Sequence, residues 1–469
     1  MYLGIDIGTS GVKSLLMDEQ QQILASAHAG LEVSRPQAGC SEQNPADWIA
    51  ATESTLDQLK QSHPKLLSAV RGVGLSGQMH GATVLGKSDQ VLRPCILWND
   101  TRSHAEAAAL DANPLFRQIS GNIVFPGFTA PKLLWMKHHE PELFNQIERV
   151  LLPKDYVRLW LTGEAVSEYS DAAGTAWLDV AKRCWSHELL EASGMHIDQM
   201  PRLVEGSDVS GQLRPELAQR WGMAKPPVVA GGGGDNAASA CGMGTVREGE
   251  AFVSLGTSGV LFAANDAYRP LPESAVHAFC HALPNTWHQM GVILSAASAL
   301  SWYAGTCGTS AETLTAALGN ELSAPEGITF LPYLSGERTP HNDSVIRGAF
   351  LGLDHRHGQP AMTRAVLSGV AFALRDNLEA LKAAGSTLQS LTAIGGGANS
   401  RYWLWLIATV LGLPIKIPVA GDFGAAFGAA RLGLLAESGV DPLSVCTAPE
   451  IKETLQPAAD QFFFVGFFW

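Results

Sequence analysis

A short glycine-rich segment carries the residue best suited to acid–base chemistry in this sequence. Gly231–Gly234 follow the strand-like run Pro227–Ala230 and lead directly to Asp235. Four glycines let a backbone approach a ligand closely, and a carboxylate at the tip can accept a hydroxyl proton while that hydroxyl attacks phosphorus. Asp235 can also act as the N-cap of the Ala-rich helix that begins at Asn236, because a cap uses one carboxylate oxygen and leaves the other available.

A second feature is a repeated turn. The pentapeptide Gly-Thr-Ser-Gly-Val occurs at Gly8–Val12 and again at Gly256–Val260. Small residues in a tight hairpin expose backbone N–H groups and two hydroxyls, which together can cradle a phosphate chain. One copy alone would indicate an ordinary hairpin, but two copies in the same context favour phosphate binding and two domains of related architecture. The strands expected on either side of the two turns are Tyr2–Ile7, Val12–Met17, Ala251–Leu255 and Val260–Ala264.

Three further features lie beside these turns or resemble them. Asp6 ends the first strand just before its turn. A carboxylate next to phosphate is unfavourable unless a cation bridges them, so Asp6 suggests Mg²⁺, bound through water. Lys13 follows the first turn, where it faces either the phosphate or solvent. Gly395–Asn399 form a third glycine-rich loop between a strand and a helix, suited to the adenosine or phosphate end of a nucleotide.

Three other motifs match known patterns only superficially. Gly81–Ser88 fit the P-loop pattern and Gly72–Gly77 fit the dinucleotide fingerprint, but each pattern requires a helix after the loop. Residues 79–85 instead read as strand, with a hairpin turn at Gly86–Asp89. His277 and His281 flank Cys280 in a strand-like run, where Cys280 points to the opposite face. We therefore expect buried, hydrogen-bonded histidines there rather than a metal site.

Strand-like and helix-like segments alternate in both halves of the chain, which predicts an α/β fold. Asn44 and Pro45 are a good helix start, and glycines at 385 and 412 end two later helices. A domain boundary is expected near Cys241–Glu250, which gives domains of 1–244 and 245–469. The expected helices are 45–61, 359–384, 400–411 and the Ala/Gly-rich 424–435, with a strand at 390–394.

Composition narrows the function classes. The 469 residues include 32 Lys and Arg against 45 Asp and Glu, a net charge of −13, and 46% of the residues are apolar. This length and apolar content predict two or three folded domains. The acidic balance argues against binding of nucleic acid, whose phosphates need basic patches. It does not exclude a small anionic ligand held by backbone N–H groups.

The cysteines and the N-terminus indicate a protein of the cytoplasm. The seven cysteines are scattered, and none lies in a C-x-x-C pair, so neither a disulfide framework nor a cysteine zinc cluster is expected. The first six residues include an acidic residue and lack the basic start of a signal peptide. No apolar run approaches the roughly 20 residues of a membrane helix, so no membrane association is expected.

These residues, taken in order, resemble the FGGY carbohydrate kinases, and most closely their xylulose-phosphorylating branch. The similarity extends from Met1 to about Ala458, and Leu151–Tyr156 and the triplet Gln78-Met79-His80 strengthen it. The motifs that carry the resemblance are Asp6–Lys13, Ser76–Gly81, Ile96–Asp100, Ser170–Gly174, Gly232–Asn236, Leu255–Gly259, Tyr333–Pro340 and Ile394–Ala398.

The resemblance implies two actin-like, ribonuclease-H-like domains, with the sugar on the first, the nucleotide on the second, and the substrate in the cleft between them. It implies transfer of the ATP γ-phosphate to the 5-hydroxyl of D-xylulose, with Mg²⁺. Asp235 falls at the position of the catalytic base and Asp6 at the magnesium-side carboxylate. The implied sugar contacts are Gln78, Met79, His80, Asp100 and Asn236. The implied nucleotide contacts are Thr9, Ser10, Gly256, Thr257, Ser258, Gly396, Gly397 and Asn399.

Two departures and two alternatives remain open. The glycine run before Asp235 is one residue longer than the family pattern, and the aromatic tail, residues 459–469, resembles no family ending. The first alternative is a kinase for ribulose, gluconate or a pentitol, since contacts in the sugar site choose the substrate. The second is an actin- or chaperone-like ATPase, which would need no sugar pocket. The apolar tail also makes a homodimer one expectation.

Overall fold

The computed structural model describes residues 1–323, 326–419 and 424–458, and these fall into two compact units. Unit 1 comprises residues 1–246, 279–287 and 422–448, and unit 2 the remainder. The division of function between 1–244 and 245–469 stays a prediction, and the tail 459–469 lies outside the described residues. No helix in the described ranges is long and apolar enough to cross a membrane.

Unit 1 is built on a mixed sheet with the strand order β13-β14-β5-β1-β2-β3. β1 pairs antiparallel with β2 across the first Gly-Thr-Ser-Gly turn and parallel with β5 on its other side, and β15 also pairs with β5. The strands are β1 (Tyr2–Ile7), β2 (Gly11–Met17), β3 (Ile23–Gly30), β5 (Gly72–Gly77), β13 (Val209–Gln212), β14 (Val228–Ala230) and β15 (Gly233–Gly234).

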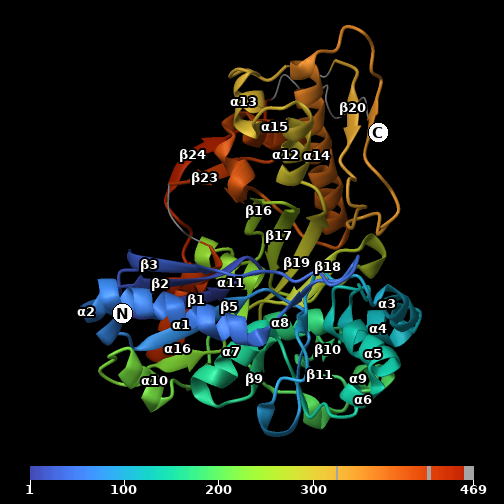
Figure 1. Cartoon of the computed structure of the whole chain (residues 1–469). Coiled ribbons are helices and arrows are strands. Elements are labelled where there is room, and N and C mark those ends of the chain that lie inside the picture. The colour runs from blue at the N-terminus through green and yellow to red at the C-terminus, as the bar shows by residue number, and fades with distance from the viewer. Residues whose placement is uncertain (324–325, 420–423, 459–469) are drawn as a thin grey trace. The chain divides into compact units, whose positions relative to one another are not determined.

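Helices cover this sheet, and α16 comes from far along the chain. In Figure 1 the red helix α16 lies beside the blue strands of unit 1. Glycines in the sheet make this close packing possible, because a β-carbon built on Gly74 would lie 1.7 Å from the Ala429 carbonyl oxygen. The larger helices of unit 1 are α1 (Pro45–Ser62), α3 (His104–Asp111), α4 (Pro114–Ser120), α5 (Thr129–His139), α7 (Pro153–Thr162), α11 (Asp235–Met243) and α16 (Ala425–Ser438).

Short elements complete unit 1 around the sheet. They are the helices α2 (Pro64–Ser68), α6 (Pro141–Phe144), α8 (Tyr169–Ala172), α9 (His187–Ala192), α10 (Pro215–Arg220) and α17 (Pro442–Val445), and the strands β4 (Glu42–Gln43), β6 (Thr83–Leu85), β7 (Cys95–Ile96), β8 (Arg149–Leu151), β9 (Val166–Glu168), β10 (Leu178–Asp179), β11 (Cys184–Trp185) and β12 (Arg202–Val204).

Unit 2 repeats the arrangement of the first sheet, in the order β18-β19-β17-β16-β22-β23-β24. β16 pairs antiparallel with β17 across the second turn and parallel with β22, as β1 does with β2 and β5. The elements are β16 (Ala251–Leu255), β17 (Gly259–Asn265), β18 (His277–Cys280), β19 (Trp287–Ile293), β20 (Thr329–Leu331), β21 (Ala349–Leu351), β22 (Leu391–Ile394), β23 (Ile415–Pro418), β24 (Ile451–Leu455), α12 (Ala297–Thr306), α13 (Ala311–Ala316), α14 (Gln359–Ala383) and α15 (Arg401–Leu411).

The local predictions agree closely with these elements. Asn44 caps α1 by accepting a hydrogen bond from the Ala46 N–H, and Ser400 caps α15 in the same way. The Ala/Gly-rich helix is longer than expected, because α16 continues to Ser438 and ends at Gly439 in the left-handed region.

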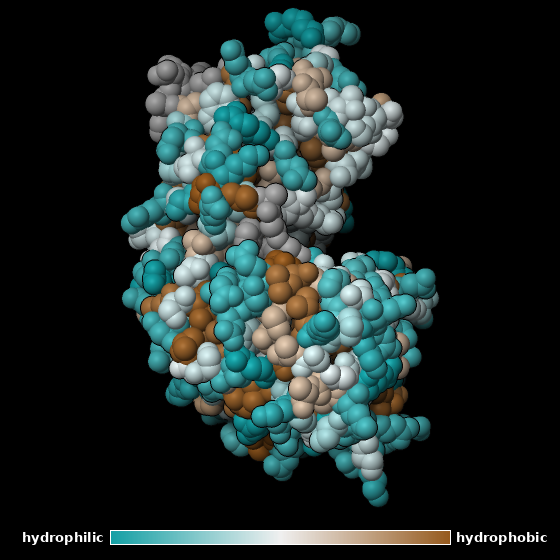
Figure 2. All heavy atoms as spheres, turned by 90° about the vertical axis from the view of Figure 1, so that its left-hand side faces the viewer, coloured by the Kyte–Doolittle hydropathy of each residue, from teal (hydrophilic) through white to brown (hydrophobic). Residues whose placement is uncertain are grey.

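Each unit has its own buried hydrophobic core. On the face drawn in Figure 2, hydrophobic residues form only small groups among hydrophilic ones.

The structure agrees with the sequence analysis on the P-loop match, the dinucleotide match and the two histidines near Cys280. Thr83–Leu85 form β6 and Lys87–Asp89 form a single 3₁₀ turn, so no helix follows the P-loop match. Gly72–Gly77 are the strand β5 itself. His277 and His281 are both buried, as expected, and His281 Nε2 lies 3.2 Å from the Thr245 carbonyl oxygen.

Candidate active site

The loop that carries Asp235 is fixed between a strand and a helix. Gly233 and Gly234 pair parallel with β5 as β15, and α11 begins at Asp235. Gly232 has φ +77°, and a β-carbon there would lie 2.1 Å from the Leu75 carbonyl oxygen, so this position requires glycine. The expectation that Asp235 is the N-cap is wrong by one residue, because the cap is Gly234.

The Asp235 carboxylate is partly exposed and has one of its oxygens occupied. Oδ1 accepts hydrogen bonds from the Asn236 N–H at 2.7 Å and from Asn236 Nδ2 at 3.0 Å. Burial and the negative charge of Asp6 raise the pKa of Asp235 to about 6, against the opposing effect of these two hydrogen bonds. A carboxylate with this pKa is unprotonated near neutral pH and is still basic enough to take a proton.

Asp6 lies opposite Lys13 in the register of β1 and β2. Burial raises the pKa of Asp6, while Ser76 and Lys13 act against that rise. Its Oδ1 atom is buried and has no hydrogen-bond partner in the described part of the chain. A buried carboxylate oxygen without a donor fits a cation or its bound water. The sequence left the direction of Lys13 open, and the register places it across from this carboxylate.

Met79 and His80 follow β5 after one intervening residue, and Met79 lies next to the Asp235 loop. A β-carbon built on Gly234 would lie 2.9 Å from Met79 Cγ, so the Met79 side chain packs against the loop. His80 has φ +68°, which is uncommon for a residue with a side chain. Its Nδ1 donates to the Gly174 carbonyl at 2.7 Å, since a carbonyl can only accept, and its ring stacks on Phe128.

A buried lysine holds the unusual backbone of His80. Lys132 Nζ donates to the His80 carbonyl at 2.8 Å and to the Gly127 carbonyl at 2.7 Å, and Thr129 Oγ1 also donates to the His80 carbonyl. Burial lowers the pKa of Lys132 to about 7. Sequence reasoning missed this residue, because a lysine in the middle of an amphipathic helix normally indicates a solvated face.

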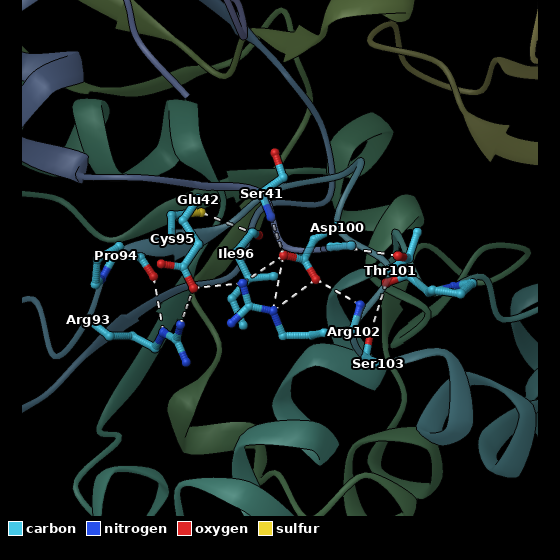
Figure 3. A network of polar contacts seen from close by, with 12 residues as sticks. Ser41, Glu42, Arg93, Pro94, Cys95, Ile96, Asp100, Thr101, Arg102 and Ser103 are labelled. Atoms are coloured by element: carbon cyan, nitrogen blue, oxygen red, sulfur yellow. Dashed lines mark hydrogen bonds and ion pairs between the residues drawn. The ribbon is translucent and has the colours of Figure 1, made fainter. Parts of the chain in front are cut away.

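Gln78 and Asp100, both predicted to contact the sugar, have side chains that are engaged within the protein. Gln78 Oε1 accepts from Thr9 Oγ1 at 3.0 Å, and Gln78 Nε2 donates to Gln43 Oε1 at 2.8 Å. Asp100 accepts from the Ser41 N–H at 2.6 Å and from Arg102 Nε and Nη2 (Figure 3). Both residues are almost fully buried. These contacts favour a supporting role, and direct sugar contact by either residue stays a prediction.

Asp100 organises a loop that borders an open pocket. This pocket, of about 340 Å³, is lined by residues between Arg35 and Ser41 and by Asn99. Asn99 Oδ1 and Ser41 Oγ are buried and have no hydrogen-bond partner among the described residues. Figure 3 shows Asp100 between Ser41 and Arg102, and Arg102 in turn contacts Glu42.

The first Gly-Thr-Ser-Gly turn is tied to an exposed tryptophan. The Gly8 N–H donates to the Gly11 carbonyl at 3.0 Å, which closes the turn, and Ser10 at its tip is exposed. Trp98 Nε1 donates to Thr9 Oγ1 at 2.9 Å, although the Trp98 side chain remains 40% exposed. A large aromatic ring anchored beside a predicted phosphate loop is a candidate ligand contact. Its only sequence signal was its place in the Ile96–Asp100 motif.

The second turn and the third glycine loop come together in unit 2. The Gly256 and Thr257 carbonyls accept from N–H groups at the start of α12, while Thr257 is exposed and Ser258 partly exposed. A β-carbon built on Gly397 would lie 2.8 Å from Leu255 Cβ, so the loop 396–399 packs against the end of β16. A β-carbon on Gly396 would meet nothing within 4 Å. The predicted nucleotide residues 256–258 and 396–399 therefore surround the end of one strand.

Two family models match almost the whole described chain. The model of the N-terminal domain of the FGGY family of carbohydrate kinases matches residues 1–242, and that of the C-terminal domain matches residues 251–437. The chain belongs to the FGGY family of carbohydrate kinases. The expected family and the expected two-domain α/β fold are thereby confirmed. As a member of this family, the chain is an enzyme that phosphorylates a carbohydrate and uses ATP.

Individual relatives and solved structures agree with this family. The chain is 53% identical to the xylulose kinase of Escherichia coli (strain K12) over 438 residues, which cover 93% of this chain and 90% of that protein. It is 37% identical to the xylulose kinase of Bacillus subtilis (strain 168), with coverages of 96% and 91%. The crystal structure of a xyloylose kinase from Brucella ovis matches with a TM-score of 0.97 and 62% identity, over 98% of this chain and 96% of that one.

Proposed function

We propose that this kinase transfers the γ-phosphoryl group of ATP to the 5-hydroxyl of D-xylulose, with Asp235 as the general base. The observation that carries the role of Asp235 is its place at the start of α11, directly after Gly234, against which Met79 packs, and its pKa is raised to about 6. The choice of xylulose is supported by the 53% and 37% identity to xylulose kinases over nearly the whole chain.

In this proposal each group has one task. Met79, His80 and Asn236 bind the sugar and orient its 5-hydroxyl, and the free oxygen of Asp235 takes the hydroxyl proton as the new O–P bond forms. In unit 2, residues 256–258 and 396–399 bind the nucleotide through backbone N–H groups and hydroxyls, and the first Gly-Thr-Ser-Gly turn of unit 1 offers the same groups to phosphate. A proton acceptor in this position contributes about 10²- to 10⁴-fold to the rate.

Mg²⁺ belongs to the proposal as well. Asp6 would hold the ion, directly or through water, because its buried Oδ1 lacks a donor in the described part of the chain. The ion would supply positive charge that neutralises the phosphate oxygens during transfer. Lys13, opposite Asp6, adds a further positive charge on the same side of the turn.

The deciding experiment is a coupled assay of ADP release across D-xylulose, D-ribulose, gluconate, glycerol and pentitols at fixed MgATP. We expect the highest kcat/KM with D-xylulose and little ADP without sugar. A higher kcat/KM with gluconate or a pentitol would assign the enzyme to another substrate of the family. ADP release that does not depend on any sugar would instead support the actin- or chaperone-like ATPase.

We also propose an oligomeric state and a cellular compartment. A homodimer is proposed from the apolar tail of the sequence, and light scattering of the purified chain tests it. A cytoplasmic location is proposed because all seven cysteines are present as thiols in the described residues, and the cytoplasm keeps thiols reduced.

A further inference from the structure

Five ionisable residues form a fully buried cluster in unit 1. Lys154, Asp155 and Arg158 come from α7, and Glu168 and Asp171 come from β9 and α8. Lys154 Nζ lies 2.9 Å from Asp155 Oδ1, 2.8 Å from Asp171 Oδ2 and 3.4 Å from Glu168 Oε1. Burying charges costs several kcal/mol per ion before pairing repays it. A buried ionic cluster is therefore weak evidence for a role in stability alone. Its hydrogen bonds to neighbouring segments of unit 1 indicate a second role.

One side chain of this cluster, Arg158, and one beside it, Ser170, reach the glycine loop that precedes Asp235. Arg158 Nη2 donates to the Gly231 carbonyl at 2.5 Å. At the other end of the loop, the Gly234 N–H donates to Ser170 Oγ at 3.1 Å. The first and the last glycine of the loop are thus each held by one buried side chain.

The contact of Ser170 with the loop has a fixed direction. The Ser170 N–H donates to Glu168 Oε2 at 2.6 Å, and the Ser170 hydroxyl donates to Glu168 Oε1 at 2.9 Å. Because the hydroxyl proton points at the carboxylate, the oxygen lone pairs are available to accept from Gly234, the residue directly before Asp235. Glycine has the largest conformational freedom of any residue. The hydrogen bond to Ser170 Oγ therefore restricts the backbone of Gly234, which sets the direction of the Asp235 side chain.

The segment that carries Glu168 and Ser170 also contacts His80, one of the predicted sugar-binding residues. Gly174, four residues after Ser170, accepts the hydrogen bond from His80 Nδ1. A β-carbon on Gly174 would lie 2.3 Å from His80 Cε1, so the two residues are in close contact. Residues 168–174 therefore touch both the Asp235 loop and His80.

We propose that Ser170 is a positioning residue for Asp235: oriented by Glu168, it holds the Gly234 N–H and so fixes the direction of the catalytic carboxylate. Arg158 secures the other end of the same loop. The inference rests on the proposed role of Asp235 and adds to it the residues that set its geometry. A small misplacement of a catalytic group is enough to lower the rate by up to about 100-fold.

The test compares Ser170→Ala with Ser167→Ala. Ser167 is a matched control, because it is equally buried and its Oγ donates to Asp155 of the same cluster at 2.6 Å, without a hydrogen bond to the loop. We expect Ser170→Ala to lower kcat about 10- to 100-fold with little change in the KM for ATP, and Ser170→Thr, which keeps the hydroxyl, to retain most of kcat. Ser167→Ala should lower Tm but leave kcat within about threefold.

A double-variant comparison separates this inference from the proposed function. If Ser170 acts through Asp235, adding Ser170→Ala to Asp235→Asn should not lower the residual kcat further. Multiplying effects, or normal kcat in Ser170→Ala when Asp235→Asn is inactive, would overturn the positioning role. Near-normal turnover of Asp235→Asn would instead overturn the proposed base. If Ser170→Ala does not fold, Ser170→Cys, which weakens the acceptor, is judged by the same criteria.

Discussion

The hydroxyl of Thr9 donates a hydrogen bond to the side-chain oxygen of Gln78, 3.0 Å away. Thr9 belongs to the first Gly-Thr-Ser-Gly turn, and Gln78 directly precedes Met79 and His80. Gln43 closes the connection, because its Nε2 donates to the Thr9 carbonyl and its Oε1 accepts from Gln78. Within unit 1 the predicted phosphate turn and the predicted sugar residues are therefore linked by side-chain hydrogen bonds.

Replacing Thr9 by valine tests this link. Valine keeps the branched shape but can neither donate to Gln78 nor accept from Trp98, and each such bond contributes about 0.5–1.5 kcal/mol. We expect kcat/KM for both ATP and sugar to fall about tenfold or more, whereas Thr9→Ser should remain near the wild-type value. Steady-state kinetics with each substrate varied in turn measures this, and a Thr9→Val value within about twofold of wild type would contradict it.

Asp235→Asn should remove proton acceptance and keep the size of the side chain. The expected loss in kcat is at least about 100-fold, the usual contribution of a positioned base. Sugar binding should change much less, because Met79 and His80 remain in place. Single-turnover kinetics and calorimetric titration with D-xylulose measure the two effects separately. Turnover close to wild type in this variant would exclude Asp235 as the base.

The pH dependence follows from the pKa of Asp235, which burial and Asp6 raise to about 6. The base must be unprotonated to act, so activity is lost as the pH falls through this value and is retained above it. We expect kcat/KM for the sugar to rise about tenfold per pH unit on the acid side and then to level off. The residual activity of Asp235→Asn should lack this inflection, and a flat wild-type profile on the acid side would refute the assignment.

The packing of α16 gives a prediction on stability. A β-carbon built on Gly428 would lie 1.7 Å from the Ala238 carbonyl oxygen of α11, a backbone atom that cannot turn away. Gly428→Ala should therefore lower the free energy of unfolding by about 2 kcal/mol or more. Gly305→Ala in α12 is the control, since its β-carbon meets nothing within 4 Å, and it should be neutral or slightly stabilising. Thermal unfolding of both variants measures this difference in stability, and equal Tm values would contradict the expected destabilisation by Gly428→Ala.

The sequence by itself determined the local elements around the site. The two hairpins, the helix starts at Asn44 and Ser400 and the strand before Gly395 depend on turn residues, caps and alternation, which act over a few residues. The order of the motifs indicated the family. The position of Asp235 on a glycine-rich entry to a helix also followed from neighbouring residues alone, although the cap itself is Gly234 rather than Asp235.

The tertiary structure decided what depends on residues far apart in the chain. The raised pKa of Asp235, at the start of α11, arises from burial and from Asp6, which lies on β1. The engagement of Gln78 by Thr9 and Gln43, and the contact of Ser170 with Gly234, join segments that no local pattern connects. Hydrogen bonds and electrostatic effects of this kind depend on distances in space, and packing of the strands and helices sets those distances.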